Sequence, residues 1–270
     1  MSLPAYEHLL LRLDSSVLTL TLNRPDRLNA ISHPMHYELE DFFERIDSMH
    51  EARAVIVTGA GRGFCAGGDV SGDIEADPQK RIYGRDAMFG YLPSRGHISR
   101  LMHAMVDCGK PLIAAVNGPA AGSGATLALL CDVVLMSESA RIGDKHTQMG
   151  LTAGDGGTFV WPLLIGLNRA KDLLLSGRMI GAEEAVRLGL ANHVVPDAEL
   201  MDAARNYAVR LAQLPELAVR TTKIACNKVL QFMLMLGGEL AVEHYARSAA
   251  GSEVERAAGV FQKRGGKPNG

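Results

Sequence analysis

The sequence carries almost no net charge and has few features of a membrane or nucleic-acid-binding protein. Its 28 Lys and Arg residues nearly balance 30 Asp and Glu residues, which leaves a net charge of −2. A chain so balanced has no electrostatic reason to bind nucleic acid or an anionic membrane. No apolar run reaches membrane-spanning length, and no N-terminal stretch has the pattern of a signal peptide. We therefore expect neither nucleic acid nor membrane as a partner, and a cytoplasmic location.

Cysteine is also scarce. The chain has four cysteines in 270 residues, Cys65, Cys108, Cys131 and Cys226, and none of them forms a C-x-x-C pair. Spacing of this kind does not predict a metal-binding or redox motif. We expect reduced, buried thiols and no metal site.

Two glycine-rich turns are the most informative feature that is present. Each follows an apolar run: Ala54–Val57 leads into TGAGRGFCAGGD (58–69), and Leu112–Val116 leads into NGPAAGSGA (117–125). Glycine lets the backbone approach a ligand closely and present bare N–H groups to it. Two such turns can hold one negatively charged oxygen between them, which is how an oxyanion hole is built.

Apolar periodicity predicts an α/β core followed by a helical C-terminal section. Expected strands are Val17–Leu22, 54–57, 112–116 and 132–136, and expected helices of the core are 36–49, 97–105 and 125–130. Later helical patterns cover 182–188, 201–214, 217–235 and 254–263. The segment 71–94 mixes charged residues with Pro and Gly, so it is predicted to be a mobile flap that selects the substrate.

Several of these motifs, in this order, resemble the crotonase superfamily, also called the enoyl-CoA hydratase/isomerase family. The resemblance rests on LNRPDRLNA (22–30), FCAGGD (64–69), the second glycine-rich turn, and segments between 180 and 196. It implies an α/β fold, a crotonase-like spiral of ββα units over residues 1–200, with a helical region over 201–270 for oligomer packing. It further implies a homotrimer or dimer of trimers, and an acyl-CoA thioester as substrate with no separate cofactor.

The resemblance also implies where the substrate binds. It places the oxyanion donors at the backbone N–H groups of Gly68 and Ser123, although the family usually has glycine at the second position. The N-terminal signature lies against CoA in the family. The other residues that we expect to bind substrate are Arg27, Ala66, Asp69, Gly122 and Thr126.

The chain departs from the family at the catalytic positions. Ordinary hydratases of the family use two glutamates, and those positions correspond to Thr126 and His146. A threonine hydroxyl is a weak proton acceptor, which argues against ordinary two-glutamate hydration.

His146 and Asp155 are the predicted catalytic pair. An imidazole titrates near pH ~6.5, so His146 can give or take a proton at neutral pH. Asp155 follows nine residues later between glycines, and a carboxylate bonded to one ring nitrogen fixes the tautomer of the other. The spacing resembles the His–Asp pair of oxo-camphor hydrolase, a relative that cleaves carbon–carbon bonds in β-diketones.

Structural roles for the same residues stay open at this point. Asp155 can instead cap a helix that begins at Gly156, and His146 can be an ordinary histidine without a catalytic role. Asp144 is expected to be a surface acid at a strand end, and Trp161 a core residue.

The leading hypothesis is an enoyl-CoA hydratase/isomerase-type enzyme that forms an oxyanion-stabilised enolate, with His146 and Asp155 in place of the usual glutamates. The alternatives are a carbon–carbon bond hydrolase acting on a small cyclic β-diketone, and a non-catalytic acyl-CoA binder.

Overall fold

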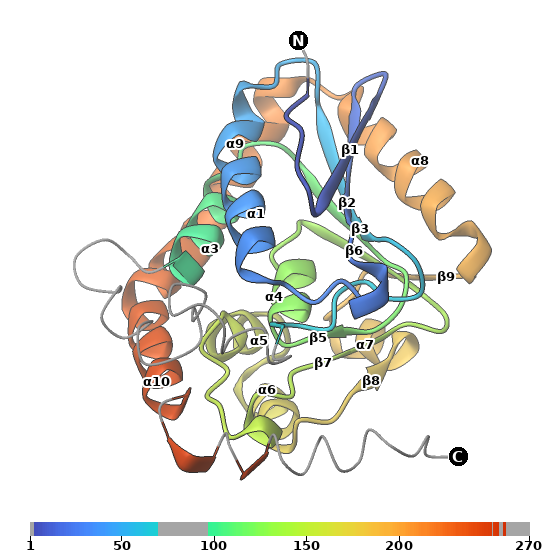
Figure 1. Ribbon diagram of the computed structural model, residues 1–270. Helices are drawn as coiled ribbons and strands as arrows, with labels where there is room; N and C mark the ends of the chain where they lie inside the picture. Colours follow the sequence, from blue (N-terminus) through green and yellow to red (C-terminus); the bar gives the residue numbers. More distant parts are fainter. Residues whose placement is uncertain (1–2, 70–96, 250, 254–255, 258–270) are drawn as a thin grey trace.

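The computed structural model describes residues 3–69, 97–249, 251–253 and 256–257 (Figure 1). The predicted flap at 71–94 and nearly all of the predicted helix at 254–263 lie outside these residues.

A six-stranded sheet forms the centre of the fold. Its order is β1-β2-β3-β4-β6-β9, with β1 and β2 antiparallel and every later pair parallel. The strands are β1 (Leu9–Asp14), β2 (Val17–Leu22), β3 (Ala54–Gly59), β4 (Leu112–Val116), β6 (Val133–Ser137) and β9 (His193–Val195). All four strands predicted from apolar runs are confirmed. Because β3 and β4 are parallel neighbours, the two glycine-rich turns leave the sheet at the same edge.

A smaller sheet pairs three short strands in the order β5-β7-β8, namely β5 (Ala120–Ala121), β7 (Arg141–Gly143) and β8 (Ile180–Gly181). Each of two long strands is followed by one of these short strands and then a helix. The two units are β4–β5–α4, with α4 at Ser123–Leu129, and β6–β7–α5, with α5 at Gly157–Ile165. This is the ββα pattern that the resemblance to the crotonase superfamily implies.

Helices cover both faces of the main sheet (Figure 1). Strand side chains alternate between faces, so Ala54 and Ile56 pack against α8 (Leu200–Ala212), while Val55 and Val57 pack on the opposite face. That opposite face carries the larger core, to which α1 (His33–Arg45) and α3 (His97–Asp107) contribute. Trp161 is fully buried in this core, as predicted.

The remaining helices are the 3₁₀ turns η1 (Pro25–Arg27), η2 (Ile46–Ser48), η4 (Thr147–Met149) and η5 (Asp197–Glu199), the α-helices α6 (Leu167–Ser176), α7 (Ala182–Leu188), α9 (Glu216–Met233) and α10 (Glu239–Ala249), and the π-helical turn η6 (Leu234–Gly238). Within the described ranges, no helix combines the length and apolar character needed to cross a bilayer.

Helix α9 is tied to the core by polar contacts as well as apolar ones. Its Lys223 ammonium lies 2.8 Å from a carboxylate oxygen of Asp132 and donates to the Lys110 carbonyl at 2.7 Å. Asn227 donates to the Val106 carbonyl at 2.8 Å. The C-terminal helices therefore pack directly on the α/β core.

The cysteines match the prediction in three cases out of four. All four thiols are free, and Cys65, Cys108 and Cys131 are buried. Cys226 is exposed on α9, which corrects the expectation of burial for that residue.

Candidate active site

The two glycine-rich turns are joined to each other by backbone hydrogen bonds. The N–H of Cys65 donates to the Pro119 carbonyl at 3.0 Å, and the N–H of Ala121 donates to the Cys65 carbonyl at 2.9 Å. The Asn117 side chain adds a bond to the Gly59 carbonyl at 2.9 Å. The relative position of the turns is thus fixed by the main chain.

Glycine is required where the turns meet. Gly67 has a φ of +100°, and a Cβ there would lie 2.9 Å from the Ala121 carbonyl oxygen and 3.9 Å from the Ser123 nitrogen. Side chains rarely adopt such a φ. Residue 67 must therefore be glycine for the Gly68 peptide to lie against the start of α4.

The backbone N–H groups of Gly68 and Ser123 are the predicted oxyanion donors. Ser123 is the first residue of α4, whose first-turn N–H groups have no helical partner and lie at the positive end of the helix dipole. Within the described residues, neither amide donates a hydrogen bond to the protein, whereas the flanking amides of Ile31 and Asp69 are both bonded. Both amides that the sequence predicts as donors are therefore unbonded within the described residues.

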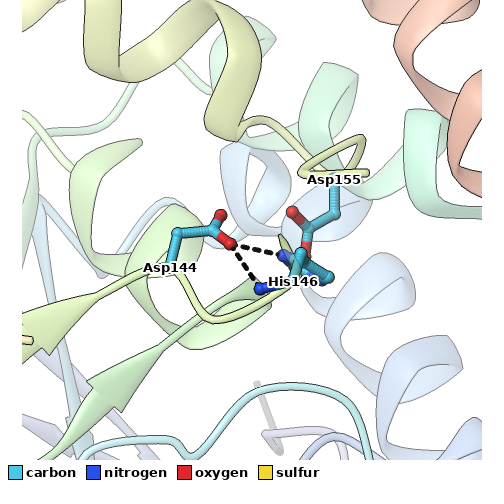
Figure 2. Close-up of side chains that lie close together, drawn as sticks. All are labelled: Asp144, His146 and Asp155. Carbon is cyan, nitrogen blue, oxygen red and sulfur yellow. Dashed lines mark hydrogen bonds and ion pairs between the residues drawn. The ribbon is translucent and has the colours of Figure 1, made fainter. Parts of the chain in front are cut away.

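A compact acid–base cluster lies beside the second turn (Figure 2). Asp144 and His146 follow β7, and Asp155 comes from the loop before α5. The His146 Nδ1 atom lies 2.7 Å from Asp144 Oδ1, and its Nε2 atom lies 3.5 Å from Asp155 Oδ2. Figure 2 shows the two carboxylates directed at the same imidazole ring.

This geometry changes the role predicted for Asp155. The carboxylate that orients His146 is Asp144, which is almost fully buried and also accepts the His146 backbone N–H at 3.0 Å. Asp144 is not the surface acid that the sequence suggests. Asp155 faces the other ring nitrogen instead, and it does not cap α5, since Gly156 is the N-cap and no side-chain cap bond forms there.

Ser123 connects the cluster to the turn. Its hydroxyl donates to Asp155 Oδ2 at 2.5 Å. The His146 ring packs over Gly122, because a Cβ at Gly122 would lie only 3.0 Å from His146 Cε1. The second glycine-rich turn therefore contacts both catalytic candidates.

Burial and charge set the protonation of the cluster. Burial disfavours the imidazolium, but the Asp155 carboxylate and the Asp144 hydrogen bond outweigh it and raise the pKa of His146 to about 9. Burial also raises the pKa of Asp155, against the opposing effects of His146 and the Ser123 hydroxyl. The site thus holds protons more tightly than exposed side chains would.

The three side chains of the cluster bring potential ligand atoms close together. Each offers an atom within 4.8 Å of the others. In the structure, His146 Nδ1 lies 2.7 Å from Asp144 Oδ1, which is the length of a charge-assisted hydrogen bond. The absence of a metal from the site stays a prediction from the sequence.

A small cavity of about 30 Å³ opens next to Asp155 and Ser123. Its walls are mainly apolar and come from α1, α3, α4 and the segment before α1; they are Ile31, His36, Leu101, Met102, Met105, Thr126, Leu127 and Leu130. The Thr126 hydroxyl is buried there and has no hydrogen-bond partner among the described residues. The cavity therefore has one polar end, where the carboxylate lies.

The other predicted substrate-binding residues lie around the first turn. Asp69 forms an ion pair with Arg24 at 2.8 Å, an interaction that was not predicted. Ala66 is exposed and donates its N–H to the Leu28 carbonyl at 3.0 Å. Arg27 is exposed on η1, whose Pro25 packs against the turn near Gly61. These residues border the turn, and within the part of the chain that the structure describes they form no hydrogen bond or ion pair with the acid–base cluster.

Comparison with known proteins shows the family. A sequence profile described as Enoyl-CoA hydratase/isomerase matches residues 12–263. The chain is 38% identical to the 1,2-epoxyphenylacetyl-CoA isomerase of Escherichia coli (strain K12) over 82% of both chains, and 36% identical to the short-chain-enoyl-CoA hydratase of Clostridium acetobutylicum over 83% of this chain and 82% of that protein.

Solved structures agree. An enoyl-CoA hydratase/isomerase from Mycobacterium paratuberculosis superposes with a TM-score of 0.84 at 35% identity, over 94% of this chain and 98% of that one. The protein belongs to the enoyl-CoA hydratase/isomerase family, in the crotonase superfamily.

Proposed function

We propose that the protein is an acyl-CoA isomerase, which shifts a carbon–carbon double bond by moving a proton through an enolate. One observation supports this above the others. Ser123 contributes a free backbone N–H at the start of α4 and, through its hydroxyl, contacts the buried carboxylate of Asp155 at 2.5 Å. The proposed oxyanion donor is the Ser123 N–H, and the proposed proton acceptor is the Asp155 carboxylate. The hydroxyl of the same Ser123 links the two groups.

The reaction can be written with all atoms accounted for. The thioester oxygen of a β,γ-enoyl thioester accepts hydrogen bonds from the amides of Gly68 and Ser123. Asp155 removes a proton from the α-carbon, and the electron pair moves onto the thioester oxygen as a dienolate, which the two amides stabilise. The same proton returns to the γ-carbon, which leaves the double bond between the α- and β-carbons.

His146 controls the proton on Asp155 in this scheme. Asp144 holds the ring through Nδ1, so Nε2 points at Asp155. The raised pKa of His146, about 9, keeps the imidazole protonated at neutral pH, and its positive charge favours the ionised carboxylate. Burial works in the opposite direction on Asp155, and a raised carboxyl pKa makes a stronger base toward a weakly acidic carbon.

Isomerisation suits this site better than hydration does. Hydration needs groups that bind and activate a water molecule, and Thr126 occupies one position where a carboxylate would be required. A relative named as an isomerase also matches most of the chain. The proposed steps use no cofactor beyond the CoA of the substrate, and the exposed Arg27 beside the first turn is a proposed contact for its phosphates.

Incubation of the purified protein with β,γ- and α,β-enoyl-CoA thioesters in D₂O tests the proposal. Mass spectrometry should find isomerised thioester, with deuterium at the α- or γ-carbon in the fraction that exchanged with solvent. Addition of one water mass would indicate a hydratase instead. Ring opening of a cyclic β-diketone, together with inertness toward every thioester, would overturn the proposal in favour of the hydrolase.

We also propose that the chain assembles as a homotrimer or a dimer of trimers. Large apolar side chains lie exposed on α9 and η6, including Leu217, Val229, Phe232, Met235 and Leu236. An apolar face of this kind is typical of a subunit interface. Light scattering on the full chain should give a mass of three or six chains, and a monomer would contradict the proposal.

A further inference from the structure

We infer that Ser123 is a positioning residue for Asp155, the proposed catalytic base. The Ser123 hydroxyl holds one carboxylate oxygen of Asp155 so that the other oxygen faces the acyl group. The family usually has glycine here, which has no hydroxyl to offer. The inference deepens the proposed function and rests on it, because it assumes that Asp155 removes the proton.

The two carboxylate oxygens of Asp155 have different contacts. Oδ2 accepts the Ser123 hydroxyl at 2.5 Å and lies 3.5 Å from His146 Nε2. Oδ1 is buried and has no hydrogen bond to another described residue. A carboxylate oxygen with free lone pairs is the one that can accept a new proton. Oδ1 is therefore the proposed acceptor, while Oδ2 anchors the side chain.

The Asp155 side chain has few other anchors. Gly154 precedes the residue, and Gly156 follows it with a φ of +121°. No helix cap fixes the side chain, since α5 begins without a side-chain cap bond. Among the described residues, Ser123 and His146 are the side chains within bonding or ion-pair distance of the carboxylate. Loss of the hydroxyl would leave only the longer of these two contacts.

The groups around Asp155 determine how its pKa responds to loss of the Ser123 hydroxyl. The groups that face it or the same cavity come from several elements: Asp144 and His146 after β7, Cys65 in the first turn and His36 on α1. Tyr245 on α10 lies against the His146 ring. The Cys65 thiol stays neutral, because burial raises its pKa to about 12. The hydrogen bond from Ser123 lowers the pKa of Asp155, so its removal should raise that pKa.

Ser123→Ala tests the inference, because it deletes the hydroxyl and keeps the backbone N–H. Loss of a hydrogen bond to a charged group corresponds to about a 10- to 100-fold drop in kcat. We expect that drop with little change in KM, and we expect the acidic limb of the kcat/KM profile to move to higher pH. Ser123→Thr, which keeps a hydroxyl, should restore the limb. Ser176→Ala on α6, whose hydroxyl bonds within its own helix, is the matched control.

A second measurement does not depend on turnover. Carbon-13 NMR titration of the aspartate carboxyls should show a higher pKa for Asp155 in Ser123→Ala than in the wild type. Identical titrations and identical pH limbs in a folded variant would overturn the inference. If the wild type converts no enoyl thioester, the proposed function fails, and the titration still decides whether Ser123 controls Asp155.

Discussion

The two halves of the candidate active site are held in place by different interactions. The glycine-rich turns hold their amides in place by main-chain hydrogen bonds and steric constraint, for example at Gly67. The Asp144–His146–Asp155 cluster depends on side chains whose charges change with pH. Backbone donors do not titrate, so the turns should work equally well over a wide pH range. We therefore expect the pH dependence of activity to originate in the Asp144–His146–Asp155 cluster alone.

The largest expected effect comes from the cluster. Asp155→Asn keeps the shape of the side chain but removes the proton acceptor. General acid–base groups contribute about 10²- to 10⁴-fold to rates, so we expect kcat to fall by that amount. Calorimetry with a non-reactive acyl-CoA thioether should show near-normal binding. A variant with more than a tenth of the wild-type kcat would assign the proton transfer to another group.

The next largest effect is expected at Ser123, which contributes its backbone N–H to one half of the site and its hydroxyl to the other. Ser123→Pro removes the backbone N–H at the first position of α4, where helices tolerate proline well. Both Ser123→Pro and Ser123→Ala lack the hydroxyl, so the two variants are compared with each other. Loss of one oxyanion donor costs about 10²- to 10³-fold in kcat, and the kcat of Ser123→Pro should be lower than that of Ser123→Ala by that factor. The difference reports the loss of the N–H together with the ring carbon that replaces its hydrogen. Equal kcat values for the two folded variants would show that this amide does not stabilise the transition state.

A smaller effect is expected from Asp144→Asn. The amide oxygen can still accept the bond from His146 Nδ1, but the negative charge is lost. The pKa of His146, about 9 in the wild type, should therefore fall, and kcat should drop by about tenfold, less than for Asp155→Asn. Proton NMR of the imidazole measures the shift directly. An unchanged His146 titration would mean that Asp155 alone sets the pKa of the ring.

The smallest effect is on stability. The pKa of His146 rises from 6.5 to about 9 on folding, and that of Asp155 also rises, so the folded state binds more protons. The contribution of His146 is fully present below pH 6.5 and is lost as pH rises through about 9. Urea unfolding of the wild type should show a free energy that declines over this interval. His146→Gln should decline less, and parallel curves for the two proteins would contradict the raised pKa.

The sequence predicted the backbone half of the site well. Apolar runs and glycines are local signals, so the strands and both turns could be located without a structure. Helix boundaries were predicted less accurately. Helix α1 begins at His33 rather than His36, although Ser32 as N-cap and Pro34 in the first turn mark that start, and α4 begins at Ser123 rather than Ala125. Apolar periodicity locates a helix but does not mark its first turn.

The side-chain half was harder to predict. The sequence predicts a surface acid at Asp144, because it does not show that the loop after β7 folds back into the core and buries this side chain. The Ser123 hydroxyl was missed for a similar reason, since its partner lies 32 residues away. Charged and polar contacts of this kind depend on tertiary packing, which leaves no periodic pattern in the chain.

Helix α10 packs against the loop 150–155, which carries Asp155. The loop's Thr152 N–H donates to the Ser248 hydroxyl at 3.0 Å, the Tyr245 ring lies 5.6 Å edge-on from that of His146, and a Cβ at Gly154 would lie 2.3 Å from the Ala241 carbonyl oxygen. Chimeras with other relatives should therefore exchange this helix and the loop 150–155 as one unit. A helix grafted alone would meet a loop shaped for a different neighbour.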